Sequence, residues 1–301
     1  MPSRSLFDDA RALVCEVINH SDPVRRVEAI TIRDDGAVLV VTTATGVRLV
    51  VKVAAARTDH PINFERTAVL TALARSTGAP VPEVLAADDA LFRGRWRYLI
   101  AEHIDGVRWR ELRPRLNTAQ VAAAHRALAE TLRRVQSVRF AAYGELDRQG
   151  QPPAGQDVVA ALHQRAELRV RDPRARAAFH ELLTRDGALF SSQDAATLCH
   201  DDLHHDNILF RQDSSGWRLV ALLDWDKAWA GPAESDVARM AFWDDMTGPG
   251  FWQVYPAPND IDDDAAHRAL IYQLLWCLEY DNGTTRHAAD TTRLRQQLSI
   301  P

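Results

Sequence analysis

Short hydrophobic stretches separated by turn residues occupy the first third of the chain. The sequences VEAITI at 27–32, GAVLVVTT at 36–43 and VRLVVKVA at 47–54 are rich in β-branched residues, and turn sequences ending in glycine separate them. We therefore predict three strands of an antiparallel meander. RYLIA at 97–101 has the composition of one more short strand.

Hydrophobic residues at helical spacing dominate most of the remaining sequence. Asn63 is placed to cap one predicted helix, which ends before Gly78, and Asn117 begins a capping box ahead of a long alanine-rich helix. Residues 144–155 are rich in glycine and proline and are predicted to form a loop. A helical pattern then returns at 158–183, with one interruption at an Asp-Pro pair.

Three short strands break the helical pattern of the second half. They are expected at 196–200, 207–210 and 218–223, and each abuts an acidic residue or a histidine. A Ser-Ser-Gly turn joins the last two into a predicted hairpin. Such a hairpin would bring the polar clusters in LCHDDLHHDNILF and LLDWDKAW to one edge.

The composition is that of an ordinary globular protein. Its 301 residues are 46% hydrophobic and 26% charged, which suits one large domain or two lobes. The formal net charge is -5 and the pI about 6.1. We therefore expect neither nucleic acid nor a membrane as a partner and favour a cationic or neutral substrate. No residue pattern bears on the oligomeric state.

Cysteine usage and the apolar segments predict a soluble cytoplasmic protein. The three widely spaced cysteines form no C-x-x-C pair, which argues against a disulfide framework and a zinc site. Asp8 and Asp9 stand where a signal peptide needs an apolar core, and the uncharged run at 269–278 is too short to span a bilayer. Lys52 and Lys227 are the only lysines among 36 basic residues, so each requires an explanation.

The two polar clusters hold the residues that phosphoryl transfer requires. Transfer from a nucleotide needs a carboxylate that takes the proton of the acceptor hydroxyl, and oxygen ligands that hold Mg²⁺ against the phosphates. Asp202, Asn207 and Asp224 supply this set. The D-x-x-x-x-N spacing lets one loop direct the carboxylate toward the acceptor and the amide oxygen toward the metal.

HDDLHHDNILF and LLDWD resemble the motifs H-G-D-L-H-x-x-N and I-D-W-[DE] of the aminoglycoside phosphotransferase and choline kinase family, whose members are protein-kinase-like small-molecule kinases. The resemblance implies that Asp202 is the catalytic base and that Asn207 and Asp224 are the Mg²⁺ ligands. The residues to which it gives structural roles are His200, His204 and Asp236.

The resemblance extends to the first half of the chain and covers about 27 to 239. It places Lys52 on the nucleotide phosphates, with Glu65 as its ion-pair partner. YLIAEHIDG resembles the linker strand of the family, whose backbone around Glu102 and Ile104 would bind the adenine edge. The implied cofactors are ATP or GTP and Mg²⁺.

The implied fold class is α+β: a two-lobed protein-kinase-like fold with a small antiparallel-sheet N-lobe and a larger, mainly helical C-lobe. We expect the lobes at 1–101 and 107–301, joined by a hinge at 102–106. The implied reaction moves the γ-phosphate of ATP or GTP to a hydroxyl of a small molecule. The leading acceptor is an aminoglycoside-like antibiotic, and the alternatives are choline, a macrolide or another small metabolite.

Two positions depart from the family pattern. Asp201 replaces the glycine before the catalytic aspartate, so strain or a raised pKa is expected if the backbone there needs glycine. The loop at 33–37 lacks a G-x-G-x-x-G pattern and carries two carboxylates near the expected phosphates. The rival hypothesis is a pseudokinase that binds nucleotide without transferring phosphate.

Three other interpretations carry less weight. A protein kinase is disfavoured because no A-P-E-like segment follows Asp224. A zinc site at the histidines of HDDLHHD lacks the H-E-x-x-H spacing. The tryptophans of the second half are expected to pack in a core rather than to line a stacking pocket.

Overall fold

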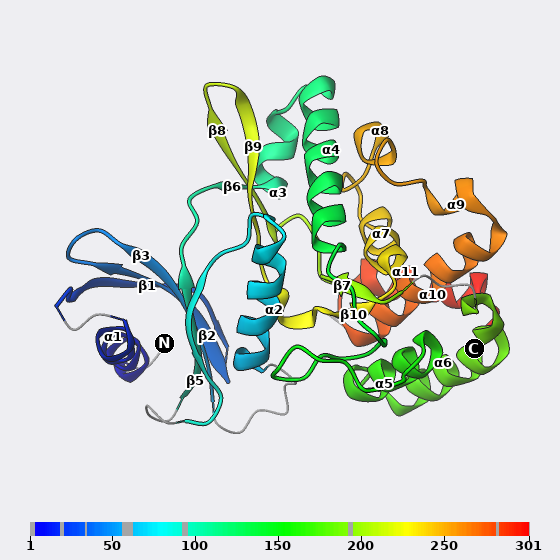
Figure 1. The fold of residues 1–301 in the computed structure, drawn as a ribbon, viewed down its shortest axis with the longest axis horizontal. Helices are drawn as coiled ribbons and strands as arrows, with labels where there is room; N and C mark the ends of the chain where they lie inside the picture. Colours follow the sequence, from blue (N-terminus) through cyan, green and yellow to red (C-terminus); the bar gives the residue numbers. More distant parts are fainter. Residues whose placement is uncertain are drawn as a thin grey trace.

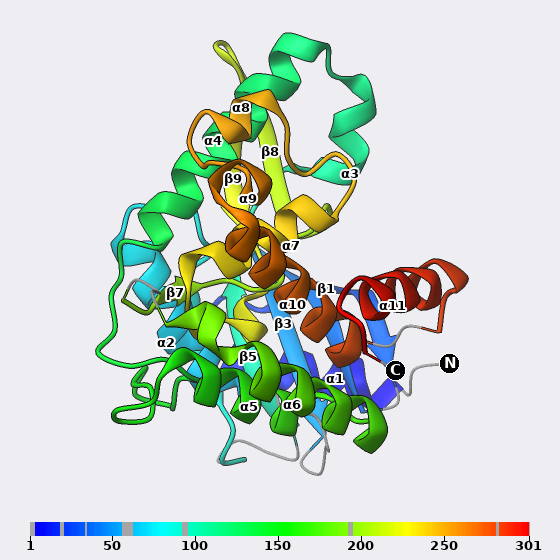
Figure 2. The ribbon, with the colours of Figure 1, turned by 90° about the vertical axis from the view of Figure 1, so that its right-hand side faces the viewer.

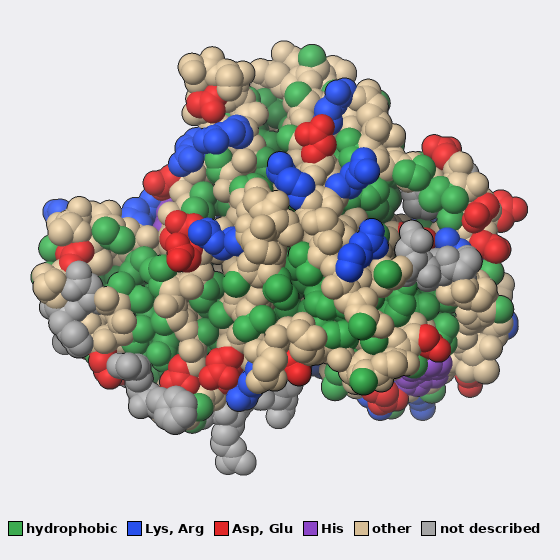
Figure 3. All heavy atoms as spheres, in the orientation of Figure 1, with side chains coloured by type: hydrophobic (Ala, Val, Ile, Leu, Met, Phe, Trp, Pro, Cys, Tyr) green, Lys and Arg blue, Asp and Glu red, His purple; other side chains and the backbone are tan. Residues whose placement is uncertain are grey.

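The chain folds into a sheet-containing part and a larger helical part (Figure 1). The structure, a computed structural model, describes residues 4–18, 21–33, 35–55, 63–91, 96–191, 195–280 and 283–300. Within these ranges no helix is long and apolar enough to cross a bilayer. Basic and acidic side chains are interspersed on the face seen in Figure 3. The two-part α+β architecture confirms the predicted fold class.

A five-stranded antiparallel sheet forms the first part, in the order β1-β2-β3-β5-β4. Its strands are β1 (Val24–Arg33), β2 (Gly36–Thr43), β3 (Arg48–Ala55), β4 (Val84–Asp88) and β5 (Trp96–Glu102). The predicted meander and the later strand are confirmed. Helix α1 (Arg4–Val17) packs Ala10 and Val14 against fully buried Val41 and Val51 on one face of this sheet.

Helix α2 (Phe64–Ser76) begins and ends where the sequence predicts. The side chain of Asn63 accepts a hydrogen bond from the amide of Arg66 (2.7 Å) and thereby satisfies a free N–H of the first turn. Gly78 follows the helix with a φ of 76°, a left-handed conformation that glycine adopts without strain. Position 34 of the loop expected near the phosphates lies outside the described residues.

The second part is mainly helical. Its helices are α3 (Trp109–Leu112), α4 (Thr118–Val135), α5 (Val158–Arg169), α6 (Pro173–Asp186), α7 (Ala233–Phe242), α8 (Pro249–Trp252), α9 (Pro258–Ile261), α10 (Asp263–Glu279) and α11 (Thr285–Gln297). The capping box of Asn117 and the break between α5 and α6 are confirmed. Helices α5, α6, α10 and α11 share one hydrophobic core at the end that carries the C-terminus (Figures 1 and 2).

Two small sheets in the helical part contain the strands that flank the polar clusters. Strands β8 (Ile208–Asp213) and β9 (Gly216–Leu222) form the predicted hairpin, which β6 (Val107–Arg108) extends. Strand β7 (Thr197–Cys199) pairs with β10 (Trp229–Gly231). The first polar cluster therefore connects β7 to β8, and the second connects β9 to β10.

Candidate active site

The polar segment between β7 and β8 is fixed from two sides. Asp236, in the first turn of α7 and 1% exposed, accepts hydrogen bonds from the amides of His200 (3.0 Å) and Asp201 (2.7 Å). His200 Nε2 donates to the backbone oxygen of Leu223 (2.8 Å), and its Nδ1 accepts from the amide of Asp202 (3.2 Å). Burial lowers the pKa of His200 to about 4, so the ring is neutral, as this bonding pattern requires.

Asp202 has one carboxylate oxygen held and the other available. Its Oδ1 accepts a hydrogen bond from Arg239 and lies 3.6 Å from Nζ of Lys227. Its Oδ2 accepts no hydrogen bond from the residues that the structure describes. Burial alone would raise the pKa of Asp202, but Lys227 and Arg239 lower it below its ordinary value. Asp202 is therefore an ionised carboxylate with a free oxygen, which suits a general base.

Asn207 and Asp224 are brought together where β8 begins and β9 ends. The amide of Leu223 donates to the backbone oxygen of Asn207 (2.8 Å). Nδ2 of Asn207 donates to the backbone oxygen of Asp202 (2.8 Å), which leaves Oδ1 without a donor among the described residues. An amide oxygen and a carboxylate are ligands that Mg²⁺ accepts, and substrate phosphates commonly complete its shell. These two side chains fit that metal.

Lys52 contacts the carboxylates that follow β9. Its Nζ lies 2.6 Å from Oδ1 of Asp224 and 2.9 Å from Oδ2 of Asp226. Burial would lower the pKa of Lys52, but the two carboxylates raise it above its ordinary value. For Asp224, burial would raise the pKa, and the contact with Lys52 lowers it instead. A charged lysine thus lies beside a candidate metal ligand.

The predicted ion pair between Lys52 and Glu65 is wrong in this structure. Glu65 lies in the first turn of α2, as predicted, but its carboxylate contacts Arg148 (3.3 Å) and accepts from the amide of Asp89 (3.3 Å). The face of α2 toward the site presents Thr67, whose hydroxyl donates to Asp226 (2.9 Å). Residues two positions apart on a helix do not share a face, so Glu65 is directed elsewhere.

The last residue of β5, Glu102, and Ile104 just after the strand are the two residues expected at the adenine edge. The carboxylate of Glu102 accepts from the amide of Glu83 (2.9 Å), so this side chain is engaged within the protein. The amide of His103 donates to the backbone oxygen of Arg48 (3.1 Å). The next amide, that of Ile104, has no partner among the described residues and is a free backbone donor in the expected hinge.

Asp201 adopts the backbone conformation that makes glycine the usual residue at its position. Its φ is 57°, in the left-handed region, which aspartate tolerates better than most residues with a β-carbon. The need for an unusual backbone is therefore confirmed. A raised pKa is found on the neighbouring Asp236, where burial and then the charge of Asp201 raise the pKa to about 6.

Sequence reasoning gave no role to three charged residues that the fold adds to this site, although one of them, Asp226, is the last residue of the LLDWD motif. Arg239 and Lys227 flank the carboxylate of Asp202, and Asp226 shares Lys52 with Asp224. The scarcity of lysine singled out Lys227, although no motif gave it a role. Arg239 is one of many arginines in the chain, and no sequence pattern distinguished it from arginines exposed to solvent.

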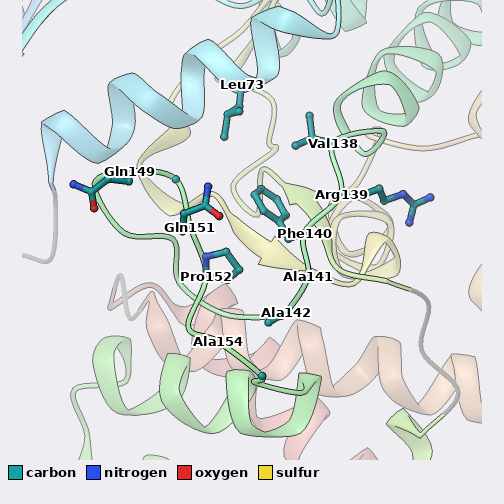
Figure 4. A pocket seen from close by; sticks show the side chains of 12 residues that line it. Leu73, Val138, Arg139, Phe140, Ala141, Ala142, Gln149, Gln151, Pro152 and Ala154 are labelled. Carbon is teal, nitrogen blue, oxygen red and sulfur yellow. The ribbon is translucent and has the colours of Figure 1, made fainter.

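A cavity of about 470 Å³ lies apart from these residues. It is lined by Leu73 of α2 and by segments that include 138–142 and 149–152 (Figure 4). None of the site residues described above lines it. It therefore adds nothing to the chemistry of the polar clusters.

Comparisons with solved structures identify the same architecture in kinases of small molecules. The aminoglycoside phosphotransferase APH(4)-Ia, crystallised as a ternary complex with AMP-PNP and hygromycin B, is 18% identical, with a TM-score of 0.67 and 97% of each chain covered. A putative fructosamine-3-kinase from Thermobifida fusca is 21% identical, with a TM-score of 0.63 and 96% of each chain covered. Choline kinase LicA from Streptococcus pneumoniae is 14% identical, with a TM-score of 0.63, covering 98% of this chain and 99% of that one.

Sequence comparison assigns the family. No curated protein sequence matches the chain. The model of the phosphotransferase enzyme family matches residues 29–270, which is most of the chain. The matched range includes both polar clusters and the strand that carries Lys52. The chain therefore belongs to the phosphotransferase enzyme family and is a small-molecule kinase.

Proposed function

We propose that the chain transfers the γ-phosphate of ATP or GTP to a hydroxyl of a small molecule, with Asp202 as the catalytic base. The observation that supports this most strongly is the free Oδ2 of Asp202, an ionised carboxylate whose other oxygen Arg239 holds. A hydroxyl bound at this oxygen can pass its proton to Asp202 while its own oxygen attacks the γ-phosphorus. The bond from that phosphorus to the bridging oxygen then breaks, and the nucleoside diphosphate leaves.

Asn207 and Asp224 would hold Mg²⁺, which neutralises charge on the phosphates when it is bound. Lys52 would bind phosphate oxygens beside the metal, since Lys52 contacts Asp224, one of the two proposed metal ligands. We propose that the adenine edge meets the backbone of Glu102 and Ile104, where one amide is free. This places the nucleotide between lobes at 1–101 and 107–301, with 102–106 as the hinge.

The ligands of the similar structures guide the choice of acceptor. The similar structures include complexes with hygromycin B and with streptomycin, as well as a choline kinase. An aminoglycoside-like antibiotic is therefore the first acceptor to test, and choline, a macrolide or another small metabolite is the alternative. We place the enzyme in the cytoplasm, where its three free cysteines would stay reduced.

The proposal is tested with the purified protein, Mg²⁺ and either ATP or GTP. Pools of aminoglycosides, macrolides, peptide antibiotics and amino alcohols are added, and nucleoside diphosphate formation is followed. Formation that depends on one pool supports phosphoryl transfer and names the acceptor class. Nucleotide binding without diphosphate formation in any pool would instead support a pseudokinase, whose best support is Asp201 at the glycine position of the family, or an acceptor outside these pools.

Replacing Lys227 with methionine is expected to lower kcat about tenfold. Its ammonium lies 3.6 Å from Asp202, and no described residue accepts a hydrogen bond from it. It is therefore free to bind an oxygen of the transferring phosphoryl group or of the acceptor. A hydrogen bond to a charged group is worth about 1.5 kcal/mol or more, which corresponds to this factor.

The measurement is steady-state kinetics of Lys227→Met beside Lys227→Arg, which keeps the charge. The arginine variant should retain more activity than the methionine variant. Equal kcat values for Lys227→Met and the unmodified enzyme would show that the ammonium takes no part in the reaction.

A further inference from the structure

Asp201 places a second carboxylate next to the catalytic aspartate. Its side chain is 13% exposed, and the acid beside it, Asp236, is 1% exposed. A buried carboxylate needs an opposite charge and hydrogen bonds to offset its lost hydration. The family pattern has glycine at this position, which needs no charged partner. In this chain the partner of the Asp201 carboxylate must therefore come from another element.

Arg165 of α5 supplies that partner. Its Nη2 donates to Oδ2 of Asp201, its Nη1 to Glu145 (2.5 Å) and its Nε to Glu279 (2.9 Å). The side chain is 1% exposed, and its guanidinium lies 4.8 Å from the ring centre of Trp229. Each guanidinium nitrogen thus meets one carboxylate, which fixes the orientation of the planar group.

The arrangement also ties the catalytic segment to distant elements. Glu145 accepts from Arg66 of α2 (2.6 Å) as well as from Arg165 and Arg169 of α5. Burial would raise the pKa of Glu145, but the arginines lower it to about 2, so it remains charged. The backbone turn at Asp201 is therefore anchored through charged groups on α2 and α5.

The geometry points to Arg165 as a positioning residue that, together with Asp201, replaces the glycine of the family motif. The pair holds the left-handed turn in which the amide of Asp201 bonds to Asp236, so the next residue, Asp202, presents its free oxygen. Without Arg165, the charge of Asp201 would be unpaired beside Asp236 and would distort this turn. The inference rests on the proposed role of Asp202.

The experiment compares kcat and the nucleotide KM in variants of the full chain. Arg165→Met is expected to lower kcat about 10- to 100-fold, as is common when a supporting contact of an active site is removed, with little change in KM for the nucleotide. The double variant Arg165→Met with Asp201→Gly should be clearly faster than Arg165→Met, because the unpaired carboxylate next to Asp202 is gone, while Glu279 still lacks its partner in both variants. A merely stabilising role for Arg165 predicts no such recovery.

Arg169→Met is the matched control, since Arg169 lies on the same helix and contacts Glu145 in the same cluster without contacting Asp201. Glu145 keeps Arg66 and Arg165 in this variant, and Asp201 keeps Arg165, so kcat should stay within about threefold of that of the unmodified enzyme, a change of less than about 1 kcal/mol in the activation free energy. If Arg165→Met does not fold, Arg165→Lys, with a single charged nitrogen, is expected to show an intermediate loss that Asp201→Gly reverses.

Three outcomes separate the possibilities. Recovery by Asp201→Gly supports the pairing. Unchanged kcat in Arg165→Met, or a double variant as slow as the single one, overturns the inference while the activity of the unmodified enzyme keeps the proposed function intact. Absence of phosphoryl transfer by the unmodified enzyme overturns the proposed function and this inference with it.

Discussion

Replacing Asp202 with asparagine is expected to lower kcat by about 10²- to 10⁴-fold, the usual range for loss of a general base. Asparagine has nearly the same shape and can still accept the hydrogen bond from Arg239 through its amide oxygen, so the fold should persist. It cannot take a proton from the acceptor hydroxyl. The measurement is kcat for phosphoryl transfer, with nucleotide affinity measured in parallel and expected to change little.

Asp206→Asn is the matched control for this variant. Asp206 lies in the same segment, but its carboxylate contacts the exposed guanidinium of Arg110 (2.7 Å). Exposed ion pairs contribute little, so its kcat should stay within about threefold of the unmodified value. Comparable losses in the two variants would show that the segment is sensitive to any change and that Asp202 has no special role.

Replacing Asp224 with asparagine is expected to lower kcat by about 10²-fold or more and to raise the Mg²⁺ concentration needed for half-maximal activity. A bound metal ion supplies several kcal/mol of charge stabilisation, and each 1.36 kcal/mol corresponds to a factor of ten. An amide is a weaker ligand than a carboxylate. The change also removes a charge that now pairs with Lys52.

The Mg²⁺ titration is run beside Asp213→Asn, at the far end of the β8–β9 hairpin, where the carboxylate accepts from Ser215. This control should need the same Mg²⁺ concentration as the unmodified enzyme. If Asp224→Asn also keeps the original Mg²⁺ requirement while losing kcat, Asp224 acts through Lys52 and does not hold the metal.

The local patterns of the sequence predicted much of the fold because they depend on neighbouring residues. Runs rich in β-branched residues between turn sequences indicated β2 and β3, and the caps at Asn63 and Asn117 fixed two helix starts. β4 was missed: VLAAD is short and alanine-rich, and it becomes a strand because it pairs with β5. α1 was missed as well, because the residues around Asp8 and Asp9 were interpreted only as evidence against a signal peptide.

The candidate site was predictable as far as its residues lie in two short motifs. Asp202, Asn207 and Asp224 are near one another in sequence, and one hairpin brings them together. Contacts between distant segments were not predictable. Arg165 reaches Asp201 from 36 positions away, and Lys52 reaches Asp224 from 172 positions away. Which charges pair across such distances depends on packing that no local pattern encodes.

The most direct test of the central claim is mass spectrometry of the acceptor after incubation with the enzyme, nucleotide and Mg²⁺, with Asp202→Asn processed identically. We expect the acceptor to gain one phosphate on a hydroxyl with the unmodified enzyme and this gain to be nearly abolished with Asp202→Asn. An acceptor that Asp202→Asn phosphorylates as fast as the unmodified enzyme would show that Asp202 is not the catalytic base.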